Sequence, residues 1–219
     1  MDVVIAGGHG QIALRLARLL SARGETVRSI VRNPAHVDDV GEAGATGVVF
    51  DLEERPAADL ARVVAGADAV VFAAGAGPGS GPQRKRTVDL GAAVKLIEAA
   101  RSAGARRYVM ISSIGADDPA AGSEAMRRYL EAKAEADAAL VGSGLDWTIV
   151  RPGMLTNEPG TSRVAVGERL ERAEVTRDDV AAVIVGVLDE PCMVGRTFVV
   201  VEGQTPIPEA LRQLCAESA

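Results

Sequence analysis

The chain has 219 residues, a formal net charge of −6 at pH 7 and an aromatic content of 3%. This length allows one domain with a large core, and the shortage of aromatic residues leaves aliphatic side chains and alanine to fill it. A mildly acidic balance with scattered arginines argues against a nucleic-acid-binding surface, and the lack of a long apolar run argues against a membrane span.

The few histidines and cysteines bear on metal binding and on the redox state of the protein. His9 and His36 are the only histidines, so a histidine-based metal site has almost no ligands available. Cys192 and Cys215 stand apart without CxxC spacing, which predicts two reduced thiols. Because the first predicted strand begins at the N-terminus, we expect no signal peptide and a cytoplasmic protein.

A strand, a glycine-rich loop and a helix open the chain. Residues 3–6 are small or branched apolar residues typical of a buried parallel strand. Gly7, Gly8 and Gly10 follow, and residues 14–20 then place apolar side chains at helical spacing. In this context glycines let the backbone approach a pyrophosphate at the positive end of the helix, which predicts a dinucleotide site. The alternative is a tight strand-to-helix turn without a ligand.

Two registers of the glycine fingerprint fit this loop. One is Gly8-x-Gly10-x-x-Ala13 and the other is Gly7-x-x-Gly10-x-x-Ala13. In both, Ala13 occupies the third glycine position, where a small residue lets the helix pack closely on the strand.

The residue after the second predicted strand, Arg32, bears on the choice of cofactor. In the dinucleotide fold, an acidic residue about 20 positions past the glycines binds the ribose 2′-hydroxyl, whereas an arginine accommodates a 2′-phosphate. The acid is absent here, and the planar guanidinium of Arg32 suits a phosphate better than a lysine would. We therefore expect NADP(H) to be preferred over NAD(H). The alternative is an ordinary surface arginine.

The third and fourth predicted strands also end in residues that suit a cofactor. Asp51, at the end of the third, is placed either to accept a hydrogen bond from an adenine amino group or to cap the following helix. The small residues Ala73, Ala74 and Gly75 end the fourth, and they would let ribose and phosphate pass close to the backbone. The glycine-rich loop that continues to residue 82 is expected to be mobile.

Two hydroxyl groups and a tyrosine–lysine pair follow. Ser112 and Ser113 end the fifth predicted strand, at an edge of the sheet where chemistry is expected. Tyr129 and Lys133 lie four residues apart on a long predicted helix and therefore share one face. With two tyrosines and few lysines in the chain, this spacing rarely arises by chance. The alternative is a tyrosine that packs beside an exposed lysine.

The C-terminal third contains a turn, an irregular segment and a capped helix. The sixth predicted strand is followed by Arg151, Pro152 and Gly153, and we expect it to stop before the proline. Residues 154–175 are rich in Gly, Thr and Arg, and we interpret them as a substrate-side lid with one short strand at 164–166. Thr176 is expected to cap the helix that follows.

The alternation of strands and helices predicts an α/β fold, a Rossmann-type doubly wound parallel sheet, formed by one domain over 1–219 with a small C-terminal lid region. The predicted strands are 3–6, 26–31, 47–52, 67–75, 108–113, 145–150 and 196–201, and the predicted helices are 14–20, 56–64, 87–103, 124–141, 176–188 and 206–215.

Several motifs together carry a family resemblance. They are residues 6–13, 31–34, 51–52, 111–113, the Tyr129–Lys133 pair, 147–153 and 176–181. In these motifs the chain resembles the atypical short-chain dehydrogenases/reductases, specifically the compact NAD(P)H-binding branch related to NmrA-like and biliverdin/flavin reductase B-like proteins. The resemblance spans essentially the whole chain.

The resemblance implies a cofactor site and a catalytic set. The catalytic set is Ser113, Tyr129 and Lys133, with Ser112 as a neighbour. The implied NAD(P)H-binding residues are Gly7, His9, Gly10, Gln11, Ile12, Arg32, Asp51, Leu52, Ala73, Ala74, Gly75, Ser112, Pro152 and Gly153. The chain departs from the pattern at Ala13, and the catalytic asparagine of better-studied relatives has no obvious match, Asp89 being the nearest polar residue.

These residues predict an NADP(H)-dependent oxidoreductase that transfers hydride to a small carbonyl or quinone-like substrate. Tyr129 would donate a proton to the substrate oxygen, aided by the charge of Lys133, and Ser113 would hold that oxygen. One alternative is a non-catalytic, NADP(H)-sensing regulator. Another is a nucleotide-sugar epimerase or dehydratase, for which the short C-terminal region leaves little room. We expect a monomer or homodimer.

Overall fold

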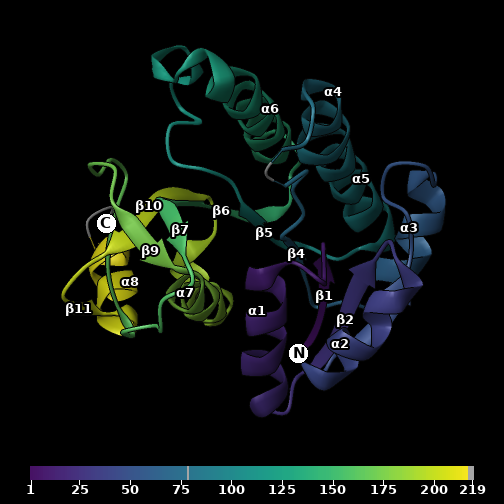
Figure 1. The fold of residues 1–219 in the computed structure, drawn as a ribbon. Helices are drawn as coiled ribbons and strands as arrows, with labels where there is room; N and C mark the ends of the chain where they lie inside the picture. Colours follow the sequence, from purple (N-terminus) through teal and green to yellow (C-terminus); the bar gives the residue numbers. More distant parts are fainter. Residues whose placement is uncertain (78, 217–219) are drawn as a thin grey trace.

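The computed structural model describes residues 1–77 and 79–216 (Figure 1). The strands are β1 (Asp2–Ala6), β2 (Thr26–Val31), β3 (Thr46–Val49), β4 (Ala69–Phe72), β5 (Arg107–Ile111), β6 (Asp146–Pro152), β7 (Met154–Thr156), β8 (Arg163–Gly167), β9 (Glu174–Thr176), β10 (Arg196–Glu202) and β11 (Thr205–Pro206). The helices are α1 (Gln11–Ala22), α2 (Val37–Glu42), α3 (Ala57–Val64), α4 (Pro82–Arg84), α5 (Ala93–Ala103), α6 (Glu124–Val141), α7 (Arg177–Asp189) and α8 (Ile207–Ala216). Short 3₁₀ turns form η1 (Pro34–His36), η3 (Pro119–Ala121) and η4 (Pro191–Met193), and η2 (Lys85–Ala92) is a stretch of π-helix.

The central sheet confirms the predicted Rossmann-type fold. Its strands pair in the order β3-β2-β1-β4-β5-β6-β10-β8-β11. The pairing is parallel from β3 to β10, and β8 and β11 join at one edge as antiparallel strands. The strand order reverses between β1 and β4, and in such sheets ligands bind at this switch point, beyond the carboxyl ends of the strands.

Helices cover both faces of the sheet, and β1 shows why its sequence is apolar throughout. Val3 and Ile5 point into the core beneath α1 and α7, whereas Val4 and Ala6 point into the core beneath α3 and α5. Successive strand residues face opposite sides, so a strand that is covered on both sides needs an unbroken apolar run.

Several elements lie where the sequence predicts them. β2 and α6 have the predicted bounds. At the start of α7 the backbone N–H of Asp179 donates to Thr176 Oγ1 at 3.0 Å, and the hydroxyl of Thr176 donates to the Asp179 carboxylate at 2.9 Å. The predicted cap is therefore confirmed, with both partners satisfied.

Other boundaries differ from the prediction. The helical run predicted from residue 87 already begins at Pro82 and passes through the π-helix η2. β6 extends through Pro152, which pairs with Val200 of β10. Proline lacks only the N–H donor, and its carbonyl oxygen accepts a hydrogen bond from Ile114 N at 3.0 Å. Residue 78, in the loop predicted to be mobile, lies outside the described residues.

The segment 154–175 is more regular than predicted. The expected short strand at 164–166 lies within β8, which pairs with β10 in the main sheet. β7 and β9 form a separate two-stranded parallel sheet. Each has only three residues, too few for an alternating pattern to show in the sequence.

The two cysteines form a disulfide, so the prediction of two reduced thiols is wrong. Cys192 lies in η4 and Cys215 in α8, with their Cα atoms 5.7 Å apart. Only the packing of α8 beside η4 brings together residues that are 23 positions apart. The expectation of a reducing compartment loses the support it took from unpaired cysteines.

Reducing the Cys192–Cys215 bond is expected to lower the free energy of unfolding by about 3 kcal/mol, because the bond restricts a loop of this length in the unfolded chain. Urea unfolding with and without reductant measures the difference. A variant with both cysteines changed to serine should match the reduced protein and should not respond to reductant. Two titratable thiols in the untreated, denatured protein would contradict the pairing.

Candidate functional site

The turn between β1 and α1 leaves the start of the helix open to an anion. Gly7 has a φ of +80°, and Gly10 N donates to Gly7 O at 2.8 Å, which closes the turn that both predicted registers share. Gly10 is the N-cap residue of α1, and no side-chain hydrogen bond caps the helix within the described chain. The first N–H groups of α1 are therefore available to a ligand phosphate.

The same glycines let the loop lie close to its neighbours. A Cβ atom on Gly7 would lie 2.6 Å from Ala74 Cα, and one on Gly8 would lie 2.5 Å from Ser29 Cβ. Real side chains do not tolerate such distances, so larger residues would push the loop away from the ends of β4 and β2. This close packing brings the loop and Ala74 to one crevice, as predicted.

A small cavity of about 170 Å³ opens beside the loop, at the ends of β2 and β3. It collects five of the predicted cofactor residues, namely Gly7, Arg32, Asp51, Leu52 and Ala74. Asp51 Oδ1 accepts backbone hydrogen bonds from Glu53 at 2.8 Å and Glu54 at 3.2 Å. Its carboxylate therefore stabilises the turn before α3, and the predicted cap of that helix is not formed.

Arg32 shares a carboxylate with a second arginine that the sequence did not single out. Arg32 Nη1 lies 3.1 Å from Glu53 Oε2, and Arg84 Nη2 lies 3.5 Å from the same oxygen. Thr87 donates to the other Glu53 oxygen at 2.6 Å. Glu53 thus holds two guanidinium groups at the rim of the small cavity, although Arg32 remains about half exposed.

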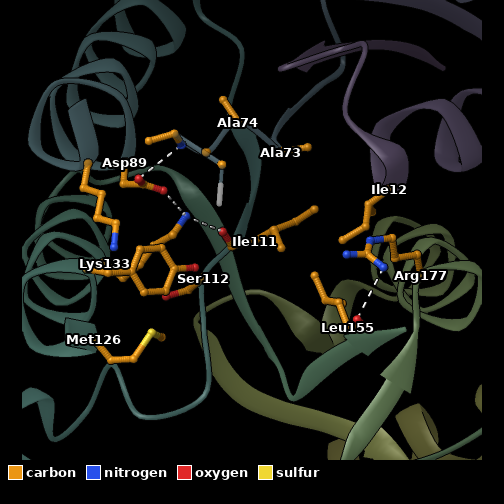
Figure 2. Close-up of a pocket in the computed structure, with 15 residues that line it drawn as sticks. Ile12, Ala73, Ala74, Asp89, Ile111, Ser112, Met126, Lys133, Leu155 and Arg177 are labelled. Atoms are coloured by element: carbon orange, nitrogen blue, oxygen red, sulfur yellow. Dashed lines mark hydrogen bonds and ion pairs between the residues drawn. The ribbon is translucent and has the colours of Figure 1, made fainter. Parts of the chain in front are cut away.

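A larger cavity of about 400 Å³ lies beyond the carboxyl ends of β1, β4 and β5 (Figure 2). Residues 73–77 line one side, and Ile12 and Arg177 project from the starts of α1 and α7. Tyr129 and Lys133 reach it from α6, as their spacing predicted. The structure therefore brings the predicted cofactor segments and the predicted catalytic pair to one space.

Lys133 is buried rather than exposed, which excludes the view of this residue as an ordinary surface lysine. Its side chain is 4% exposed, and Nζ lies 3.3 Å from Asp89 Oδ1 and donates to the Ile111 carbonyl oxygen at 3.1 Å (Figure 2). Nζ also lies 5.9 Å from the centre of the Tyr129 ring. Asp89, which the sequence offered only as the nearest polar residue to a missing asparagine, is thus the direct partner of the lysine.

The two serines at the end of β5 have different surroundings. Ser112 is buried and its hydroxyl donates to Asp137 Oδ2 at 2.9 Å. Ser113 is half-buried, and its hydroxyl has a long contact of 3.4 Å with the Ile114 carbonyl oxygen. The hydroxyl of Ser113 is therefore the less tightly held of the two.

Asp137 links Ser112 to the next strand. Its Oδ2 accepts hydrogen bonds from Arg151 Nε at 3.1 Å and Nη2 at 3.0 Å. Burial raises the pKa of Asp137, while the charge of Arg151 and the hydrogen bond from Ser112 act in the opposite direction. Three elements, β5, α6 and β6, are joined here by charged or hydroxyl groups.

A third cavity, of about 750 Å³, continues from the second towards residues 154–175. The two cavities share five lining residues, which are Ser112, Met126, Tyr129, Leu155 and Arg177. Ser113, Pro152 and Gly153 line only the third. Tyr129 therefore lies at the junction between the cavity of the cofactor segments and a cavity lined in part by the predicted lid.

Three predicted cofactor residues, His9, Gly10 and Gln11, do not line these three cavities. His9 Nε2 lies 2.7 Å from Asp39 Oδ2, and its ring stacks on His36 at 3.6 Å between centroids. Gln11 is exposed at the first position of α1. Conversely, sequence reasoning missed Lys85 and Arg177, which line the 400 Å³ cavity. Arg177 belongs to the motif 176–181, but no local pattern indicates that either residue faces this cavity, because packing between helices places them there.

The sequence model of a protein family described as NAD(P)H-binding matches residues 7–191. This chain belongs to that family. The resemblance inferred from the sequence is thereby confirmed, and the matched residues begin at the first glycine of the loop. A small-molecule ligand, NAD(P)H, follows from membership.

Relatives of this NAD(P)H-binding protein carry names of more than one activity. It is 41% identical to the uncharacterized sugar epimerase YhfK of Bacillus subtilis, over 98% of this chain and 100% of the relative. A Bacillus halodurans structure provisionally named an NAD-dependent epimerase/dehydratase matches with a TM-score of 0.92 and 40% identity, covering 98% of this chain and 100% of that one. The oxidoreductase ylbE from Lactococcus lactis matches with a TM-score of 0.88 and 29% identity, covering 99% and 97%.

Residues 1–77 and 79–216 of this NAD(P)H-binding protein contain no group of three or more His, Cys, Asp or Glu side chains arranged to hold a metal ion. None of their helices combines the length and apolar character that crossing a membrane requires.

Removing the Asp137 carboxylate is expected to destabilise the fold. Asp137→Ala leaves the largely buried guanidinium of Arg151 with only the exposed Asp117, at 3.7 Å, and should cost about 3 kcal/mol of unfolding free energy. Asp137→Asn keeps an acceptor for Ser112 and should cost less than half as much. Urea unfolding at neutral pH compares the two variants, and equal losses would contradict this account.

The ionisation of the Asp137 carboxyl group also makes the free energy of unfolding depend on pH. Because burial raises the pKa of Asp137 above 3.8, the folded chain binds this proton more tightly than the unfolded chain does. The contribution of Asp137 to stability therefore falls as the pH rises from 3.8 through the raised pKa. The wild type should lose stability relative to Asp137→Asn across that interval.

Proposed function

We propose that this protein is an NADP(H)-dependent oxidoreductase that reduces a small carbonyl or quinone-like substrate at Tyr129. The observation that carries the proposal is the position of Tyr129 at the junction of two cavities, with a buried lysine 5.9 Å from its ring centre. One cavity contains the cofactor segments, and the other leads to residues 154–175.

The residues that line these cavities are suited to nicotinamide adenine dinucleotide phosphate, NADP(H). The uncapped first turn of α1 offers N–H groups to the diphosphate. Arg32 and Arg84, held together by Glu53, offer two guanidinium groups to a 2′-phosphate beside the small cavity. The backbone of residues 73–75 would lie along the ribose. When bound, NADPH supplies the hydride for the reduction.

The proton that the substrate oxygen gains comes from a side chain of the protein. Tyr129 donates its hydroxyl proton to the substrate oxygen as the carbonyl carbon gains the hydride, so that an alcohol forms, and the phenolate is then reprotonated by water. Ser113 donates a hydrogen bond to the same oxygen. Lys133, fixed by Asp89 and Ile111, holds its ammonium group 5.9 Å from the centre of the Tyr129 ring. Residues 154–175 act as a lid in a single domain over 1–219, and residues such as Met154 and Arg172 line the substrate side.

A second candidate activity comes from the name of the relative YhfK, a sugar epimerase at 41% identity. An epimerase that uses the same Ser, Tyr and Lys groups takes a hydride from its substrate and returns it. Net consumption of NADPH with a carbonyl or quinone therefore favours the reductase. Interconversion of sugar epimers without net NADPH oxidation favours the epimerase, and NADPH binding without either reaction favours an NADP(H)-sensing regulator.

Tyr129→Phe is expected to abolish turnover, with a loss of about 100-fold or more, because phenylalanine has no proton to donate. NADPH affinity should change less than about twofold, since the phenyl ring keeps its place in the cavity. NADPH absorbance with a panel of quinones, aldehydes and diketones measures turnover, and calorimetric titration measures affinity. Undiminished turnover would remove Tyr129 from the mechanism.

Arg32→Met is expected to weaken NADP⁺ binding by about tenfold to 100-fold, the usual contribution of one charge-assisted hydrogen bond. Binding of NAD⁺, which lacks the 2′-phosphate, should change little. Isothermal titration of wild type and variant with both nucleotides gives the comparison. Wild-type affinities that are equal for NADP⁺ and NAD⁺ would show that Arg32 does not bind a phosphate.

A further inference from the structure

Tyr129 has two lysines beside its ring, and only one of them belongs to the predicted catalytic set. Lys133 Nζ lies 5.9 Å from the ring centre, and Lys85 Nζ lies 5.7 Å from it. Lys133 comes from α6, one turn beyond Tyr129, whereas Lys85 comes from η2 across the cavity. Two elements thus present positive charge to one aromatic ring.

The two lysines differ in how their charge is balanced. Lys133 is paired with the buried carboxylate of Asp89 at 3.3 Å. Within residues 1–77 and 79–216, no carboxylate lies within 4.0 Å of Lys85 Nζ. Two lysines and one aspartate leave one net positive charge beside Tyr129. Because Asp89 offsets the charge of Lys133, the unbalanced charge belongs to Lys85.

The π-helix explains how one element supplies both a lysine and an aspartate. Lys85 and Asp89 are four residues apart in η2, close to one turn of its wide spiral, and both line the 400 Å³ cavity. Tyr129 and Lys133 have the same separation on α6 (the aspartate–lysine contact is drawn in Figure 2). The two facing turns place Lys85 next to Tyr129 and Asp89 next to Lys133. Single π-helical turns are often found at functional sites.

We propose that Lys85 is a positioning residue that supplies the net positive charge beside Tyr129. Lys133 does not supply it, because the Asp89 carboxylate offsets the charge of Lys133. The proposal rests on the proposed function of Tyr129 as proton donor. Once the proton has left, the phenolate is negative, and a cation within 6 Å of the ring stabilises it. A paired lysine contributes less, because the carboxylate 3.3 Å from its Nζ offsets its charge.

Other charged groups also line the cavities around Tyr129. They are Arg177 at the start of α7, Arg172 and Glu174 in the lid, and Glu202 at the end of β10. Within the described chain none of these four groups lies over the Tyr129 ring, whereas both lysines do. These four groups are unchanged in every variant below. Differences in the titration midpoint between the variants therefore come from the substituted residues.

Ionisation of Tyr129 can be followed without cofactor or substrate. Tyr108 is the other tyrosine, and its complete burial raises its pKa well above the usual value, so it stays protonated while Tyr129 titrates. The ultraviolet absorbance of the phenolate therefore reports Tyr129, and circular dichroism at each pH confirms that the chain stays folded. This titration remains informative even if no substrate is reduced.

Lys85→Met is expected to move the absorbance midpoint to higher pH by about 0.5 unit or more, the effect of one partly screened charge near 6 Å. Asp89→Asn should move it to lower pH, because it frees the charge of Lys133. The double variant, Lys85→Met with Asp89→Asn, restores one net charge and should return close to wild type. Arg86→Met is the matched control, since Arg86 lies next to Lys85 but pairs with Glu135 at 3.6 Å, and it should not shift the midpoint.

Steady-state kinetics add a second readout if the proposed reduction is observed. Lys85→Met should lower kcat by about threefold or more, leave NADPH affinity within about twofold, and move the pH profile of kcat in the same direction as the absorbance midpoint. Lys85→Arg, which keeps the charge, should restore most of kcat. An unchanged midpoint in Lys85→Met, or a double variant whose midpoint stays as high as that of Lys85→Met, would overturn the role of Lys85 whether or not turnover is detected. Absent turnover with the expected midpoints would instead count against the proposed function alone.

Discussion

The geometry of the site depends on the burial of the Lys133 ammonium group. A charge with a 4% exposed side chain needs compensating partners, which here are the Asp89 carboxylate and the Ile111 carbonyl oxygen. These contacts fix α6 against η2 and against the end of β5. Tyr129, one helical turn earlier, is consequently held at the junction of the two larger cavities.

A second buried charged group lies one turn further along the same face of this helix. Asp137, also on α6, binds Ser112 at the end of β5 and Arg151 in β6. The hydroxyl of Ser112 is thereby directed at the carboxylate, whereas Ser113 makes no contact with it. Together the two buried clusters attach α6 to the carboxyl edge of the sheet, where the loop between β1 and α1 also lies.

Much of this site could be predicted from local sequence. The glycine loop is recognisable because a strand, three glycines and a helix follow one another, and its turn is shared by both predicted registers. Arg32 and Asp51 lie where strand ends place them, beside one small cavity. Tyr129 and Lys133 share a face because the α-helix repeats every 3.6 residues. His9 and Gln11 were assigned by position in the loop alone, and both lie outside the three cavities.

The sequence by itself determined the alternation of strands and helices, and with it the parallel sheet, because the periodicity of apolar residues is a local property. Only the tertiary structure decided which distant residues became partners. It paired Asp89 with Lys133, Glu53 with both Arg32 and Arg84, and Cys192 with Cys215. Such pairs depend on how helices pack across the sheet and on the extra width of a π-helical turn, and neither leaves a pattern in neighbouring residues.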